Sequence, residues 1–169
     1  MMNRPARNLS IFAAFVTGIA VGTLGMAVAA QANRIDGNMG VNHVGITVER
    51  LDEAIATYNK MFGFGEAAVI RDDKGQPTLA FIQVSRNTFI ELAPATATNR
   101  PGLSHFGLEV TDIKAATAGL QQRGVKIDNP RVGRTISFIT STTEPSGVRM
   151  ELSEIGPESM LGKAIAAWK

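Results

Sequence analysis

The residues best suited to chemistry in this chain are its two histidines, which occupy equivalent places in an internal repeat. His43 opens the segment His-Val-Gly-Ile-Thr-Val, and His105 opens the similar segment His-Phe-Gly-Leu-Glu-Val 62 residues later. Each half of the repeat ends in an apolar stretch with one embedded carboxylate, Glu91 in Phe-Ile-Glu-Leu and Glu151 in Arg-Met-Glu-Leu. Two imidazoles and two carboxylates at duplicated positions are a suitable ligand set for a divalent metal ion.

Alternation along the strands predicts that these four side chains share one face. If Val44, Ile46 and Val48 pack under the helix that follows them, the side chain of His43 points to the opposite face. By the same alternation, the side chain of His105 also points away from its helix. Glu91 and Glu151 each lie between two apolar residues that face the helix, so their side chains point to the same opposite face. We therefore expect all four side chains in a cleft between the two halves of the repeat.

Residues 41–155 predict the same order of elements twice. Strands are expected at 43–48, 69–70, 79–84 and 88–93, and a helix at 51–62, in the first half. In the second half, strands are expected at 105–110, 125–127, 135–140 and 148–153, and a helix at 113–123. The prediction is an α+β fold of two tandem βαβββ modules, 41–95 and 103–155, that form a cleft or half-barrel. A C-terminal helical tail, 156–169, is expected to pack on the body or on a second subunit, with a lid over the cleft as the alternative.

Other polar residues are weaker candidates for the cleft. Arg149 has the parity of Glu151 and could meet an anionic substrate at the cleft mouth, with an ion-paired or solvated arginine as the favoured interpretation. Glu109 could support the site or lie at its rim, and the face on which Gln83 lies is ambiguous. Ser104 and His105 are not expected to form a catalytic dyad, because neighbours on a strand point to opposite faces.

Residues 1–32 have the features of a secretory signal peptide. Arg4 and Arg7 precede an uncharged stretch of 22 residues, 9–30, and Ala-x-Ala sites follow at 27–29 and 30–32. The uncharged stretch is also long enough to cross a bilayer, so an uncleaved membrane anchor is the alternative. Either form predicts an exported body, periplasmic or secreted, and the anchored form would be tethered to the inner membrane. Residues 33–40 are predicted to be a short polar linker.

Composition excludes several classes of function. The 169 residues include no cysteine, which excludes disulfides, thiolate ligands and thiol catalysis. Beyond residue 32 the chain has 15 basic and 15 acidic side chains, because Arg4 and Arg7 are the only charged residues before it. A neutral body without interleaved aromatic and basic residues gives no indication of nucleic-acid binding.

The segments quoted above resemble the vicinal oxygen chelate superfamily, which includes glyoxalases, bleomycin-resistance proteins and dioxygenases. The resemblance covers residues 41–155 and includes Tyr58, Gly63-Phe64 and the segment 103–110. In metal-dependent members the ligands lie on the first and last strands of each module, which implies ligation by His43, Glu91, His105 and Glu151. This set is most similar to bacterial glyoxalase I, a lactoylglutathione lyase. Methylmalonyl-CoA epimerases match less well, because they have a glutamine at the position of Glu91.

The resemblance implies a metal-dependent lyase or isomerase. A His₂Glu₂ set suits Ni, Co, Zn, Mn or Fe, with two positions left for adjacent oxygens of a small-molecule substrate. Similarity to glyoxalases implies that Glu151 removes a carbon-bound proton, with Glu91 as its counterpart. Glutathione and CoA thioesters are chiefly cytoplasmic, so an exported protein is expected to act on a different substrate.

Two other functions stay open at the level of sequence. The cleft could bind a small molecule without chemistry, as in resistance proteins, although such members typically lack the full ligand set. An extradiol-type dioxygenase would use a His₂Glu iron site, and the fourth ligand, Glu91, argues against it. The sequence also leaves open whether the cleft closes within one chain or between the chains of a homodimer.

Overall fold

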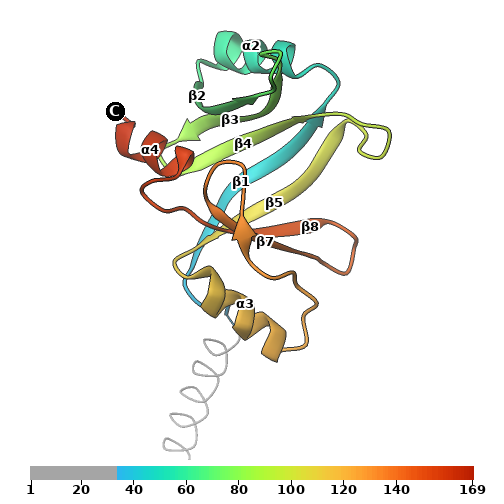
Figure 1. Cartoon of the computed structure of the whole chain (residues 1–169), viewed down its shortest axis with the longest axis vertical. Helices are drawn as coiled ribbons and strands as arrows, with labels where there is room; N and C mark the ends of the chain where they lie inside the picture. The colour runs from blue at the N-terminus through green and yellow to red at the C-terminus, as the bar shows by residue number, and fades with distance from the viewer. Residues whose placement is uncertain (1–33) are drawn as a thin grey trace, which may run out of the picture. The chain divides into compact units, whose positions relative to one another are not determined.

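The computed structural model describes residues 34–169, and one mixed sheet of eight strands runs through them (Figure 1). The strand order is β2-β3-β4-β1-β5-β8-β7-β6. The first module contains β1 (Asn38–Val48), α2 (Leu51–Phe62), β2 (Gly65–Arg71), β3 (Pro77–Ser85) and β4 (Thr88–Pro94). The second contains β5 (Gly102–Val110), α3 (Ile113–Gln122), β6 (Arg131–Val132), β7 (Phe138–Thr143) and β8 (Arg149–Glu154), and α4 (Met160–Ala167) follows. The predicted α+β fold of two βαβββ modules is confirmed.

The two modules join edge to edge in the middle of the sheet. β1 and β5 pair antiparallel, while the last strand of each module lies parallel to the first, β4 beside β1 and β8 beside β5. The four strands that carry the candidate ligands are therefore neighbours at the centre of the sheet. All four come from one chain.

Helices α2 and α3 each cover one face of their own module. Leu51 and Ile55 of α2 pack on Ile82 and Leu92, and the alternate β1 residues Ile46 and Val48 join this cluster. In the second module, Ile113, Ala116 and Leu120 of α3 pack in the same way on Val110 of β5 and Leu152 of β8, and these five residues form the α3 cluster. The side chains between these apolar residues must then point to the other face of the sheet, as the alternation predicted.

The C-terminal tail packs on the body. Ser159 caps α4 by accepting a hydrogen bond from the backbone N–H of Gly162. Leu161 is buried against Phe81 and Phe89, which lie on the face of the first module that α2 does not cover. This arrangement covers part of the cleft side of the first module.

The structure differs from the sequence prediction at several places, and three of them bear on the chain around the site. β1 begins at Asn38, so the end of the expected linker 33–40 lies in a strand. Residues 125–127 are not a strand, because Val125 and Ile127 turn inward to pack on the α3 cluster, and the short strand β6 takes their place. β7 begins at Phe138 rather than at residue 135, because Ile136 has a left-handed φ of 65° that interrupts the extended chain.

The expected signal peptide or anchor, residues 1–32, lies outside the described residues. Within residues 34–169, none of the helices has the length and apolar character needed to cross a membrane.

Candidate metal centre

Antiparallel pairing of β1 and β5 brings the two histidines together. His43 lies opposite Gly107, and His105 lies opposite Gly45. The two Nε2 atoms are 3.2 Å apart, and the residues are only 1% and 2% exposed. The histidines therefore meet inside the fold although 62 residues separate them in the sequence.

Each imidazole lies directly over the glycine of the opposite strand. A Cβ at Gly45 would be 2.0 Å from Cε1 of His105, and a Cβ at Gly107 would be 1.9 Å from Cε1 of His43. Since atoms cannot approach so closely, only glycine leaves room for the rings. The His-x-Gly spacing of the repeat is therefore part of the site. The role of this spacing becomes visible only in the paired strands, because alternation along one strand does not show what lies opposite a glycine.

The two glutamates approach the histidines from the outer strands. Parallel pairing sets Glu91 beside Gly45 and Glu151 beside Gly107. Oε2 of Glu91 lies 3.8 Å from Nε2 of His43 and 3.5 Å from Nε2 of His105, and Oε1 of Glu151 lies 3.7 Å from Nε2 of His43. One ligand atom from each of the four residues lies within 4.8 Å of the other three. The structure thus brings the expected residues together, while their ligation of a metal stays a prediction.

A polar neighbour orients each histidine. Nδ1 of His43 lies 2.7 Å from Oδ1 of Asn42, and Nδ1 of His105 lies 2.8 Å from Oγ of Ser104. An amide oxygen only accepts hydrogen bonds, so Nδ1 of His43 carries the proton and its Nε2 presents a lone pair. The two neighbours were expected to point to opposite faces of the strand, but the Ser104 hydroxyl reaches back to the His105 ring, while the absence of a catalytic dyad stays a prediction. Both orienting residues directly precede a histidine, and the repeat could have revealed them.

Burial and the charges of neighbouring groups shift the pKa values of His43, Glu91 and Glu151. Desolvation lowers the pKa of His43 to about 4, with further lowering by the charges of His105 and Arg149 against the effect of Glu91. Burial by itself would raise the pKa of Glu91, but the hydrogen bond and charge of His105 hold it below the ordinary value. Burial and the negative charge of Glu91 raise the pKa of Glu151. A neutral His43 and an ionised Glu91 at converging positions fit a divalent cation, which compensates the buried lone pairs and charge.

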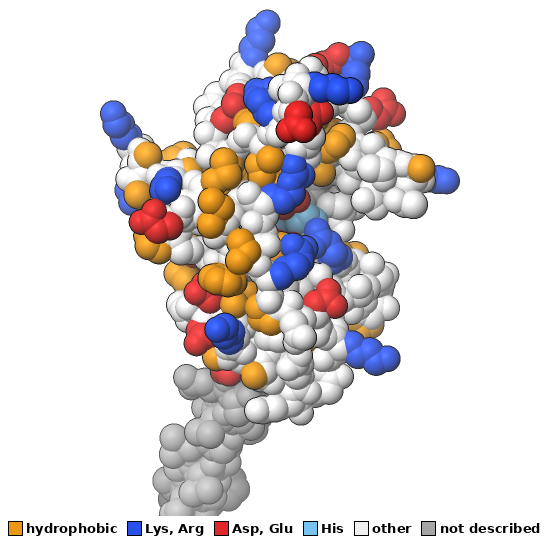
Figure 2. All heavy atoms as spheres, viewed as in Figure 1, with side chains coloured by type: hydrophobic (Ala, Val, Ile, Leu, Met, Phe, Trp, Pro, Cys, Tyr) orange, Lys and Arg blue, Asp and Glu red, His pale blue; other side chains and the backbone are white. Residues whose placement is uncertain are grey.

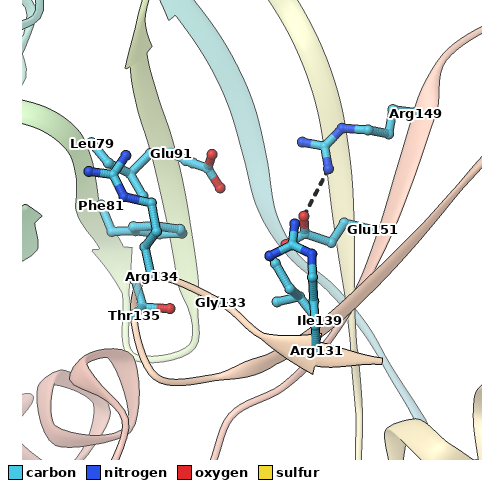
Figure 3. Close-up of a pocket in the computed structure, with 10 residues that line it drawn as sticks. All are labelled: Leu79, Phe81, Glu91, Arg131, Gly133, Arg134, Thr135, Ile139, Arg149 and Glu151. Carbon is cyan, nitrogen blue, oxygen red and sulfur yellow. Dashed lines mark hydrogen bonds and ion pairs between the residues drawn. The ribbon is translucent and has the colours of Figure 1, made fainter. Parts of the chain in front are cut away.

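A pocket of about 240 Å³ opens over the two glutamates (Figure 3). Its lining residues are Leu79, Phe81, Glu91, Arg131, Gly133, Arg134, Thr135, Ile139, Arg149 and Glu151. The histidines are not part of this lining and lie beneath it, and Figure 2 shows a small histidine surface in a hollow bordered by Lys and Arg side chains. The candidate metal centre is therefore the floor of the pocket.

Three arginines line the pocket, and sequence analysis identified only one of them. Nη1 of Arg149 donates to Oε2 of Glu151 over 2.9 Å, as the expected ion pair. Arg134 donates to the carbonyl oxygen of Thr78 over 3.2 Å and also to the Thr78 hydroxyl. Arg131 and Arg134 lie in and beside β6, where the sequence has no clear strand alternation, so no pattern placed them in the cleft.

The two remaining candidates lie outside the pocket. Gln83 is buried, and its Nε2 donates to the carbonyl oxygen of Arg86 over 3.0 Å. Glu109 does not line the pocket, although partial burial raises its pKa. Phe81 instead forms the wall on the β3 side, with its ring centroid 5.9 Å from that of His43.

Comparison with known structures finds the same fold in several epimerases. Methylmalonyl-CoA epimerase from Mycobacterium tuberculosis is 27% identical, with a TM-score of 0.63, and the match covers 74% of this chain and 93% of that one. A variant of Streptomyces coelicolor methylmalonyl-CoA epimerase in complex with 2-nitronate-propionyl-CoA is 25% identical, with a TM-score of 0.57 and coverage of 69% and 97%. A hypothetical protein from Bacillus halodurans, 18% identical over 70% of this chain and 96% of its own, shares the fold with a TM-score of 0.57.

Family comparison agrees with the structural one. No curated protein matches the sequence. Residues 42–140 match the model of the Glyoxalase/Bleomycin resistance protein/Dioxygenase superfamily, which confirms the family that the repeat had indicated. The chain belongs to the glyoxalase/bleomycin resistance protein/dioxygenase superfamily, the vicinal oxygen chelate fold.

Proposed function

We propose that this protein is a divalent-metal-dependent isomerase or lyase that moves a proton on a carbon next to a carbonyl group. The convergence of His43, Glu91, His105 and Glu151 at the floor of a pocket carries this proposal. A bound Ni, Co, Zn, Mn or Fe ion would act as a Lewis acid toward two adjacent oxygens of the substrate. The epimerase neighbours support it, since an epimerase inverts a stereocentre.

Glu151 is the proposed base. Its carboxylate lines the pocket, where it can reach a substrate and accept a proton from it. Arg149 holds one carboxylate oxygen, Oε2, and so fixes the direction of the other. Glu91 lies across the pocket (Figure 3) and is the proposed counterpart that returns the proton from the opposite side.

We also propose that the protein is exported and acts on a small substrate other than a glutathione or CoA thioester. The leader-like residues 1–32 support export, and such thioesters are chiefly cytoplasmic. A pocket of about 240 Å³ also favours a compact molecule. Leu79 and Phe81 form an apolar part of the pocket wall that also contains Glu91.

Metal content tests the proposal first. Metal-free protein would be reconstituted in turn with each of the five ions, and bound metal would be measured by elemental mass spectrometry. We expect about one ion per chain in the wild type, because the four ligand atoms form one cluster. His105→Ala should lose the ion. Glu109→Gln is the matched control, because it removes a carboxylate from the same strand outside the pocket and should keep the ion.

Proton exchange then tests the reaction. The metal-loaded protein would be incubated in D₂O with 2-hydroxy aldehydes and 2-oxo acids, and loss of the adjacent C–H signal would be followed by NMR. Exchange in the wild type that Glu151→Gln abolishes would support the assigned base. Absence of bound metal after every reconstitution would overturn the catalytic proposal and leave a binding protein. Oxygen consumption with a catechol by the iron-loaded protein would replace it with a dioxygenase.

A further inference from the structure

We propose that the substrate is a dianion whose second anionic group is bound by Arg131 and Arg149 on the side of the pocket formed by the second module. The inference rests on the proposed function for the end of the substrate that chelates the metal. It adds a specific requirement for the other end.

The charge of the pocket supports an anionic ligand. Three arginines and two glutamates line it, which leaves a net charge of +1 before a divalent ion is bound. An ion below the glutamates would raise this excess further. A neutral or cationic substrate would leave the excess uncompensated, whereas an anion is both attracted and oriented by it.

Arg131 is the guanidinium best placed to receive the second anionic group. Its side chain is exposed and lines the pocket, and within residues 34–169 it forms no hydrogen bond or ion pair. Arg149 uses Nη1 for Glu151, and a guanidinium has further N–H groups for another acceptor. Arg134 is less available, because its two terminal nitrogens are bonded to Thr78. In Figure 3, Arg131, Arg149 and Glu151 lie together on one side of the pocket, across from Glu91.

The repeat shows that this polar side is specific to the second module. Strand pairing makes Phe81 the equivalent of Ser141, since the two lie beside Glu91 and Glu151 respectively. By the same register Phe89 is the equivalent of Arg149. The first module therefore fills its half of the cleft with aromatic rings and Leu161, while the second keeps an open half with arginine. A substrate with one chelating end and one anionic end matches this asymmetry.

A matched pair of ligands tests the inference. 2-Oxoglutarate and 2-oxopentanoate have the same chelating 2-oxo acid, and only the former has a second carboxylate. We would measure the Kd of each for the Co²⁺-loaded full chain by calorimetry, a readout that does not depend on turnover. One charge-assisted contact predicts that 2-oxoglutarate binds about 10-fold more tightly. Arg131→Gln should remove most of this preference, and Arg100→Gln, an exposed arginine outside the pocket, should keep it.

The outcomes separate this inference from the function on which it rests. Equal affinities for the two acids, or a preference that survives Arg131→Gln, would overturn the second anionic site and leave the chelating site intact. If neither acid binds the Co²⁺-loaded protein, both the anionic site and the proposed chelation are overturned. A preference for 2-oxoglutarate that weakens as salt is raised would support the inference, since screening reduces exposed charge contacts.

Discussion

His43 is kept neutral by burial, and this makes the stability of the metal-free protein depend on pH. Its pKa falls from 6.5 to about 4 on folding, so the unfolded chain takes up a proton more readily than the folded one. His43 therefore does not reduce the free energy of unfolding above pH 6.5, where it is neutral in both states. That free energy decreases as the pH falls from 6.5 toward 4, because His43 is then protonated in the unfolded chain and still neutral in the folded one. Between pH 7 and 5 the expected loss from this residue is about 2 kcal/mol.

This loss of unfolding free energy can be measured by chemical unfolding of the metal-free wild type and of His43→Gln at pH 7 and at pH 5. Glu151 acts in the opposite direction, because its raised pKa means that protonation at low pH favours the folded state. It is present in both proteins, so the difference between their pH profiles isolates His43. Parallel profiles would show that His43 is not held neutral in the fold.

Single residues also show how far sequence reasoning could go. The four central side chains could be placed because each lies on a strand with regular alternation, and alternation fixes the face on which a side chain lies. Arg131 and Arg134 could not be placed, because the chain between α3 and β7 has one two-residue strand and a left-handed residue, Ile136. The orientation of His105 by Ser104 was missed because strand parity describes side-chain direction at Cβ and not the reach of a hydroxyl.

At the level of elements, the close pairing of β1 and β5 makes the site depend on glycine. We predict that Gly107→Ala destabilises the protein by about 1–3 kcal/mol and weakens Co²⁺ binding, because its methyl group would displace the ring of His43. Gly65→Ala is the control, since a Cβ there meets nothing within 4 Å. Thermal unfolding and metal titration of the two variants would check this. Equal behaviour of the two would show that β1 and β5 can separate without cost.

Helix α4 contributes to stability by packing on a cluster that includes Phe81, one of the residues that line the pocket. Leu161 is 3% exposed and packs in the cluster that contains Phe81. Leu161→Ala is expected to cost about 2–4 kcal/mol of unfolding free energy, through lost burial and the cavity left behind. Leu103→Ala, at a side chain 68% exposed, should change stability by less than about 0.5 kcal/mol. Similar unfolding midpoints for the two variants would show that α4 does not pack on the sheet in solution.

For the whole molecule, the structure describes one of the two arrangements that the repeat left open. Two βαβββ modules can form a cleft within one chain or by exchange between two chains, and the same sequence pattern fits both. Here β1 pairs with β5 of its own chain, so His43, Glu91, His105 and Glu151 all come from one polypeptide. The asymmetry between the halves was equally hidden, because the equivalence of Phe89 and Arg149 becomes visible only once the register is known.

The proposed export would have to leave this arrangement intact, and the positions of the expected cleavage sites are compatible with it. The Ala-x-Ala sites end at Ala29 and Ala32, and β1 begins only at Asn38, so a processed chain keeps every described strand. We predict that the full chain, expressed in a bacterium and fractionated, yields a mature form beginning at Ala30 or Asn33, as read by intact-mass spectrometry. A chain of full length in the membrane fraction would indicate the anchored form, and a chain of full length in the cytoplasm would contradict export. Removal of residues 2–32 is the control: that protein should stay in the cytoplasm and still bind about one Co²⁺ ion, because all four ligands lie beyond the deletion.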